Sequence, residues 1–73
     1  MKLLARDAVE QIRREYPKGT RVQLISMVDP RSDMITGLQG SVIFVDSTGT
    51  IHIAWDNGSS LGAVYGVDII RKL

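Results

Sequence analysis

Apolar residues recur at helical spacing near the start of the chain. Leu4, Ala8 and Ile12 stand four residues apart, which places them on one face of a helix. Pro17 disfavours helical geometry at the residue before it and ends the pattern. We therefore predict a helix over residues 2–15. A helix of this length is marginal in isolation, so it must pack against the rest of the chain or against a second copy.

From residue 20 onward the pattern changes to short strands. Apolar and β-branched runs separated by turn residues predict five of them, at 20–27, 41–46, 50–55, 59–64 and 67–71. In the third strand Ile51, Ile53 and Trp55 share one face, which we expect to be the core face. The second strand does not alternate, because residues 42–45 are all apolar. It is either covered on both sides or bent by a bulge.

The connections between most of these strands are tight. Ser47-Thr48-Gly49 and Asp56-Asn57-Gly58 have the composition of hairpin turns, and Tyr65-Gly66 separates the last two strands. Short strands with tight connections favour a curled sheet, because curling removes exposed edges.

The predicted protein is therefore mainly β. It is a small SH3-like five-stranded barrel at residues 17–73, preceded by one N-terminal α-helix at residues 1–16, in a single domain 1–73.

The turn sequence at 56–58 needs no function, since Asp, Asn and Gly are what a tight turn requires. The register of Trp55 likewise favours the core, and its alternative is an exposed aromatic that stacks on a ligand.

One connection, at residues 28–39, is longer than the rest. In so small a domain a loop of this length is more often functional than idle. Met34, Ile35 and Leu38 lie within it. Either they fold back to cap the barrel or they form an apolar contact patch for a protein partner.

Composition narrows the chemistry. The chain of 73 residues has no cysteine and one histidine, so it has no disulfide framework and cannot assemble a typical zinc centre. His52 with Ser59 and Ser60 suggests a hydrolytic arrangement only in composition, because no nucleophile elbow or oxyanion loop accompanies them. We expect no catalysis, no cofactor and no metal. No apolar run is long enough to span a bilayer, so we expect a cytoplasmic protein.

Charge is unevenly distributed although the net charge is only +1. Residues 1–21 hold six basic and three acidic side chains, which gives +3, and residues 22–73 hold three basic and five acidic ones, which gives −2. The first part includes four cations near the helix end: Arg13, Arg14, Lys18 and Arg21. They either contact phosphates or form a solvated helix end that complements the helix dipole.

Several short stretches together carry a family resemblance. They are Tyr16-Pro17-Lys18-Gly19-Thr20-Arg21-Val22, Gly40-Ser41-Val42, Gly66-Val67-Asp68 and the most specific of them, Ile51-His52-Ile53-Ala54-Trp55-Asp56-Asn57-Gly58-Ser59-Ser60. From residue 16 to residue 70 the chain resembles domain-of-unknown-function family 4314, small proteins of bacterial phages and integrative elements. The hairpin alone also resembles small SH3-like barrels of the Mind-bomb/HERC type and KOW and tudor modules. The resemblance implies an SH3-like barrel with an interaction role and brings no established activity.

The chain departs from the family pattern in the long loop and the fourth strand. Val28 stands where a second acidic residue is expected, and Arg31 stands where an aromatic residue is usual. Thr36-Gly37-Leu38 stands where Pro-Gly-Thr is usual, and Tyr65 replaces a proline. The predicted helix lies outside the similar region. These departures point to a partner peculiar to this member of the family.

We therefore expect a non-catalytic binding module for a protein or peptide, belonging to a phage or mobile element. Its candidate binding residues come from the long loop, the hairpin turn and two aromatic positions: Asp29, Arg31, Asp33, Met34, Trp55, Asp56, Asn57 and Tyr65. The acidic barrel ends would favour a basic or mixed partner surface.

Two alternatives stay open. The first is a nucleic-acid-binding KOW-like barrel that uses the four cations near the helix end as its footprint. The second is a homo-oligomer that sequesters a nucleotide or other small ligand at subunit interfaces lined by Trp55, Tyr65 and backbone amides.

Overall fold

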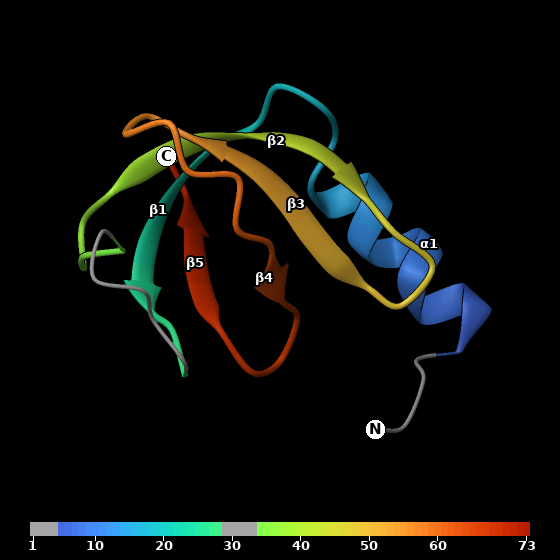
Figure 1. Ribbon diagram of the computed structural model, residues 1–73. Helices are drawn as coiled ribbons and strands as arrows, with labels where there is room; N and C mark the ends of the chain where they lie inside the picture. The colour runs from blue at the N-terminus through green and yellow to red at the C-terminus, as the bar shows by residue number, and fades with distance from the viewer. Residues whose placement is uncertain (1–4, 29–33) are drawn as a thin grey trace.

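The computed structural model describes residues 5–28 and 34–73 as one antiparallel sheet with a helix beside it (Figure 1). In chain order the elements are α1 Arg6–Glu15, β1 Arg21–Ser26, β2 Gln39–Val45, β3 Thr50–Trp55, β4 Ala63–Val64 and β5 Ile69–Lys72. The strands lie in the order β4-β3-β2-β1-β5. The prediction of a mainly β protein with five strands and one N-terminal helix is confirmed.

Helix α1 ends where the sequence predicted. Its last residue is Glu15, two residues before Pro17, and the backbone N–H of Tyr16 donates to the Ile12 carbonyl at 2.8 Å. The predicted helix start at residue 2 lies outside the described residues. None of the helices in the described part of the chain has the length and apolar character to cross a bilayer.

The helix packs on the sheet of its own chain, beside the turn between β2 and β3 (Figure 1). Val9 and Ile12 are buried on its inner face. A hydrogen bond also joins the helix to β2, because Arg13 Nε donates to the carbonyl of Val45 at 3.0 Å. Of the two predicted partners for this helix, the structure shows the chain's own sheet.

A bulge in β2 explains the unbroken apolar run at residues 42–45. Val42 pairs with Ile53 and Phe44 pairs with His52, so Ile43 is the extra residue between them. Val42 and Val45 are buried, whereas the side chains of Ile43 and Phe44 are 40% and 52% exposed. The bulge was one of the two predicted explanations, and it turns two large apolar side chains outward.

The predicted strand at 59–64 is mostly wrong, since only Ala63–Val64 is a strand. The side chain of Trp55 explains why the rest of the segment is not a strand. Trp55 Nε1 donates to the Leu61 carbonyl at 2.8 Å, and the Leu61 N–H donates to Ser59 Oγ at 3.4 Å. This stretch therefore uses its polar groups around the indole ring and not in a strand ladder.

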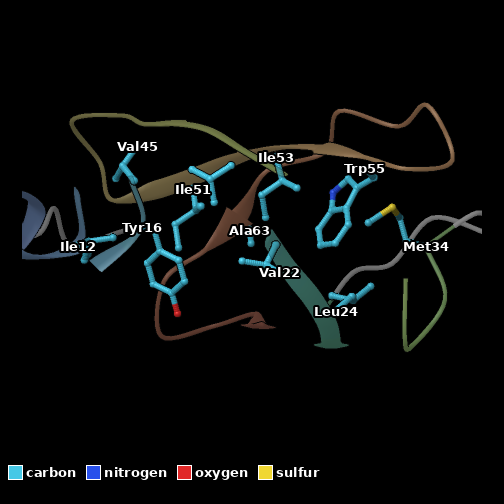
Figure 2. Close-up of a cluster of buried hydrophobic side chains, with 11 residues drawn as sticks. Ile12, Tyr16, Val22, Leu24, Met34, Val45, Ile51, Ile53, Trp55 and Ala63 are labelled. Carbon is cyan, nitrogen blue, oxygen red and sulfur yellow. The ribbon is translucent and has the colours of Figure 1, made fainter. Parts of the chain in front are cut away.

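The core lies where the inner face of the sheet meets Tyr16 and the loop residue Met34. Figure 2 shows side chains of β2 and β3 directed toward those of β1 and toward Tyr16. Ile51, Ile53 and Trp55 are all buried, so the predicted core face of the third strand is confirmed. Met34 is buried as well and Leu38 packs against the core, which is the capping alternative; Ile35, in contrast, is exposed.

Candidate functional site

A cavity of about 270 Å³ opens between the two edge strands β4 and β5. The β4–β5 segment supplies most of its lining, and Tyr16 and Ile51 complete it. The lining residues are Tyr16, Ile51, Ala63, Val64, Tyr65, Gly66, Asp68, Ile69 and Ile70. The cavity is a candidate site, and of the residues predicted for binding it contains Tyr65.

Asp68 builds the turn that shapes this cavity. Its Oδ2 accepts from the Val64 N–H at 2.9 Å and its Oδ1 accepts from the Val28 N–H at 3.0 Å. The N–H groups of Val67 and Asp68 both donate to the Val64 carbonyl, and Gly66 takes a φ of +82°. One carboxylate therefore ties the end of β1 to the β4–β5 turn. The sequence reasoning missed Asp68, and an acidic residue two positions after a turn glycine was the available signal.

Two tyrosines face the cavity from different elements. The Tyr16 ring is buried, and its hydroxyl points away from the rest of the core cluster (Figure 2). Burial, together with the nearby Glu15 and Tyr65, raises the pKa of Tyr16, so this hydroxyl stays protonated and can donate a hydrogen bond. Lys72 Nζ lies 5.4 Å from the Tyr16 ring centre and donates to the Glu15 carbonyl.

Two of the residues that line the cavity are exposed apolar side chains. Tyr65 and Ile69 are 44% and 56% exposed. Val67, between the lining residues Gly66 and Asp68, is 51% exposed. We call these three residues the apolar rim. Clustered exposed apolar side chains mark interaction sites on soluble proteins.

The candidate binding residues of the long loop are only partly described. Asp29, Arg31 and Asp33 lie outside the described residues. Met34 is buried in the core, where it lies beside Trp55 (Figure 2). Trp55 is itself only 3% exposed and its indole N–H is already bonded. The alternative of an exposed stacking tryptophan is therefore wrong, because the strand register turns the ring inward.

Asp56 and Asn57 are exposed, and each has a structural partner. Arg21 holds Asp56 in a bidentate ion pair, with Nη1–Oδ1 at 2.9 Å and Nη2–Oδ2 at 2.6 Å, and the hydrogen bond from Arg21 lowers the pKa of Asp56. Asn57 Oδ1 accepts from the Ser59 N–H at 3.0 Å. Positive φ is confined to Gly58 in this turn. Turn geometry thus accounts for these residue types.

His52 and Phe44 form a stacked pair on the opposite face of the sheet from the core. Their ring centres are 4.3 Å apart and the planes differ by 6°. His52 Nε2 lies 2.8 Å from Asp46 Oδ2, and Asp46 Oδ1 accepts from the Thr48 hydroxyl and from the N–H groups of Thr48 and Thr50. The hydrogen bonds from Thr48 and His52 hold the pKa of Asp46 well below its usual range. The carboxylate is charged and fixes the imidazole ring.

A family model described as a domain of unknown function, DUF4314, matches residues 5–73 of the chain. The chain belongs to this family. The match confirms the resemblance seen in the sequence and extends it, because it includes α1, which the quoted motifs left outside. Comparisons with curated proteins and with solved structures found no match.

The four cations of this family member are not equivalent. Arg13 pairs with Glu10, and Arg21 is held by Asp56. Arg14 and Lys18 are exposed. Arg13 and Lys18 line a common cavity. Within the part of the chain that the structure describes, no group of three or more His, Asp or Glu side chains could hold a metal ion.

Proposed function

We propose that the protein is a non-catalytic binding module for a protein or peptide and that it binds its partner at the cavity between β4 and β5. The observation that carries the proposal is the position of the apolar rim beside this cavity. A small domain buries a smaller share of its surface than a large one and needs its apolar side chains for the core. The exposure of Tyr65, Val67 and Ile69 within one short segment beside the cavity therefore favours a contact site.

The size of the cavity favours a partner side chain. Small-molecule sites commonly measure about 300–1,000 Å³, and this cavity, at about 270 Å³, suits one bulky apolar group. Tyr16, one of the lining residues, carries a hydroxyl that can donate a hydrogen bond to a partner. Both bordering strands are sheet edges, and an extended peptide can add main-chain hydrogen bonds to an edge strand.

The proposal includes an SH3-like arrangement of the sheet and a role in a phage or mobile element. The first is supported by five short antiparallel strands in the order β4-β3-β2-β1-β5. The second is supported by the resemblance of the motifs at residues 16–70 to a family of such elements.

Selection of displayed random peptides against the protein tests the site. We expect selected peptides to bind Tyr65→Ala at least about tenfold more weakly than the wild-type protein, because a central aromatic contact typically contributes more than 1 kcal/mol to an interface. Ile35→Ala is the control, since Ile35 is also a large exposed apolar side chain but is not among the residues that line the cavity. Nuclear magnetic resonance shifts on binding should centre on Val64 and Ile69. Peptides that bind both variants equally would exclude this site.

One observation favours the small-ligand alternative as a second candidate. A polar hollow of about 550 Å³ is lined by His52 and residues 57–62, which is within the range of small-molecule sites. Trp55 and Tyr65, the predicted lining, are not part of it. Absorbance near 260 nm of protein purified from a bacterial lysate, before and after heat release, tests for a retained nucleotide. A spectrum of protein alone counts against this candidate.

A further inference from the structure

The bulge in β2 creates a second feature that the peptide site does not explain. It exposes Ile43 and Phe44 next to the end of α1, where a cavity of about 200 Å³ lies. The helix end and the following turn supply part of its lining, and β2 supplies the rest. The lining residues are Arg13, Tyr16, Pro17, Lys18, Ile43, Phe44 and Val45. An exposed aromatic ring and two cations thus border one opening.

The Phe44 ring stacks on a histidine that is itself held in place. The planes of Phe44 and His52 are nearly parallel, and His52 Nε2 is hydrogen-bonded to Asp46. Phe44 is nevertheless 52% exposed, and it lines a cavity that Pro17 and Lys18 also line and His52 does not. An exposed aromatic ring that is already stacked on one neighbour is suited to stack on another planar group.

The charge beside this ring favours an anionic ligand. Lys18 forms no ion pair within residues 5–28 and 34–73. Arg13 is partly offset by Glu10, and residues 1–21 carry a charge of +3 overall. Bulges commonly re-aim side chains at functional sites. A planar group next to a negative charge is the chemistry of a nucleobase and its phosphate.

We propose that Phe44 stacks on a nucleobase and that Lys18, with Arg13 beside it, binds the adjoining phosphate. A single-stranded nucleic acid and a free nucleotide both present this chemistry. Stacking on an aromatic side chain tolerates any base, and phosphate contacts carry no sequence information. The site therefore binds without strong sequence preference. It differs from the predicted four-cation footprint, because Arg14 and Arg21 do not line this cavity and Phe44 was not among the predicted residues.

Fluorescence anisotropy of a labelled oligothymidine, with adenosine monophosphate as competitor, tests the proposal. Phe44→Leu keeps the apolar bulk but removes the ring face, and we expect it to weaken binding by about 5- to 150-fold, the range for loss of one base stack. Phe44→Tyr keeps the ring and should bind within about threefold of the wild-type protein. Lys18→Ala should lower the slope of log affinity against log salt by about 1.

The outcomes are distinct. Competition by the mononucleotide assigns the site to a single nucleotide, and binding of the strand without such competition assigns it to a strand. Absence of binding of both probes to the wild-type protein overturns the proposal, and so does equal binding by Phe44→Leu when circular dichroism shows it folded. Tyr65→Ala, at the peptide cavity, should bind both probes normally, so this test is independent of the peptide proposal.

Discussion

At the scale of single residues, side-chain carboxylates organise the turns on both sides of the sheet. Asp46 accepts hydrogen bonds from Thr48, Thr50 and His52, and Asp68 accepts from two backbone N–H groups. Each carboxylate satisfies donors that a tight turn would leave without a strand partner. The two candidate surfaces therefore depend on exposed and half-buried hydrogen bonds as well as on the apolar groups they display.

Asp46 makes the free energy of unfolding depend on pH in the acid range. Its pKa in the folded protein is lowered, so its charged form favours the folded state. That contribution is complete above the unfolded pKa of about 3.9 and is lost as the pH falls below it. We expect Asp46→Asn to lower the free energy of unfolding by about 1–2 kcal/mol near neutral pH and to flatten its decline between about pH 5 and pH 2.

Urea unfolding across this pH range measures the effect. Asp7→Asn is the control, because Asp7 is exposed in the first turn of α1 and should keep the wild-type acid profile. A decline in Asp46→Asn as steep as that of the wild-type protein would contradict the assignment of this carboxylate.

At the scale of elements, periodicity predicted the strand whose side chains alternate and missed the effect of a hydrogen bond made by a side chain. Ile51, Ile53 and Trp55 alternate on one face, and the predicted third strand matches β3 residue for residue. The predicted strand at 59–64 was wrong, because the bond from Trp55 to Leu61 is absent from any local pattern.

The candidate sites show the same division. Tyr65 was named from the sequence and lines the peptide cavity. The stacked Phe44–His52 pair could not be named, since the apolar run at 42–45 does not say which residue the bulge inserts, and a shift by one residue reverses the faces. Asp68 was missed because one of its partners, Val28, lies 40 residues away.

The pairing of β2 with β3 depends on one glycine. A Cβ added to Gly40 would lie 2.7 Å from Ile53 Cγ2 and 2.9 Å from the Ala54 carbonyl oxygen, so the two strands would have to separate. We expect Gly40→Ala to destabilise the protein by about 1–3 kcal/mol, measured by urea unfolding. The control Ser60→Ala changes an exposed position and should stay within about 0.5 kcal/mol of the wild-type protein. A Gly40→Ala variant of wild-type stability would contradict the close approach.

At the scale of the whole molecule, the fold returns the C-terminal strand to the first strand and to the end of α1. β1 pairs with β5, the Leu73 N–H donates to the Arg21 carbonyl, and Lys72 reaches the last turn of α1. The cavity between β4 and β5 and the cavity beside Phe44 share Tyr16, which follows α1 directly. A ligand in either cavity would therefore lie next to the same helix end.

The pairing of Val22 with Lys72 also sets when the protein can fold. During synthesis, the edge of β1 that pairs with β5 has no partner strand until Lys72 has been translated. Contacts between residues this distant in sequence slow the search for the native state, because the intervening chain must be ordered before they form. Earlier in synthesis, β1 therefore presents an open edge, which molecular chaperones or neighbouring nascent chains can reach.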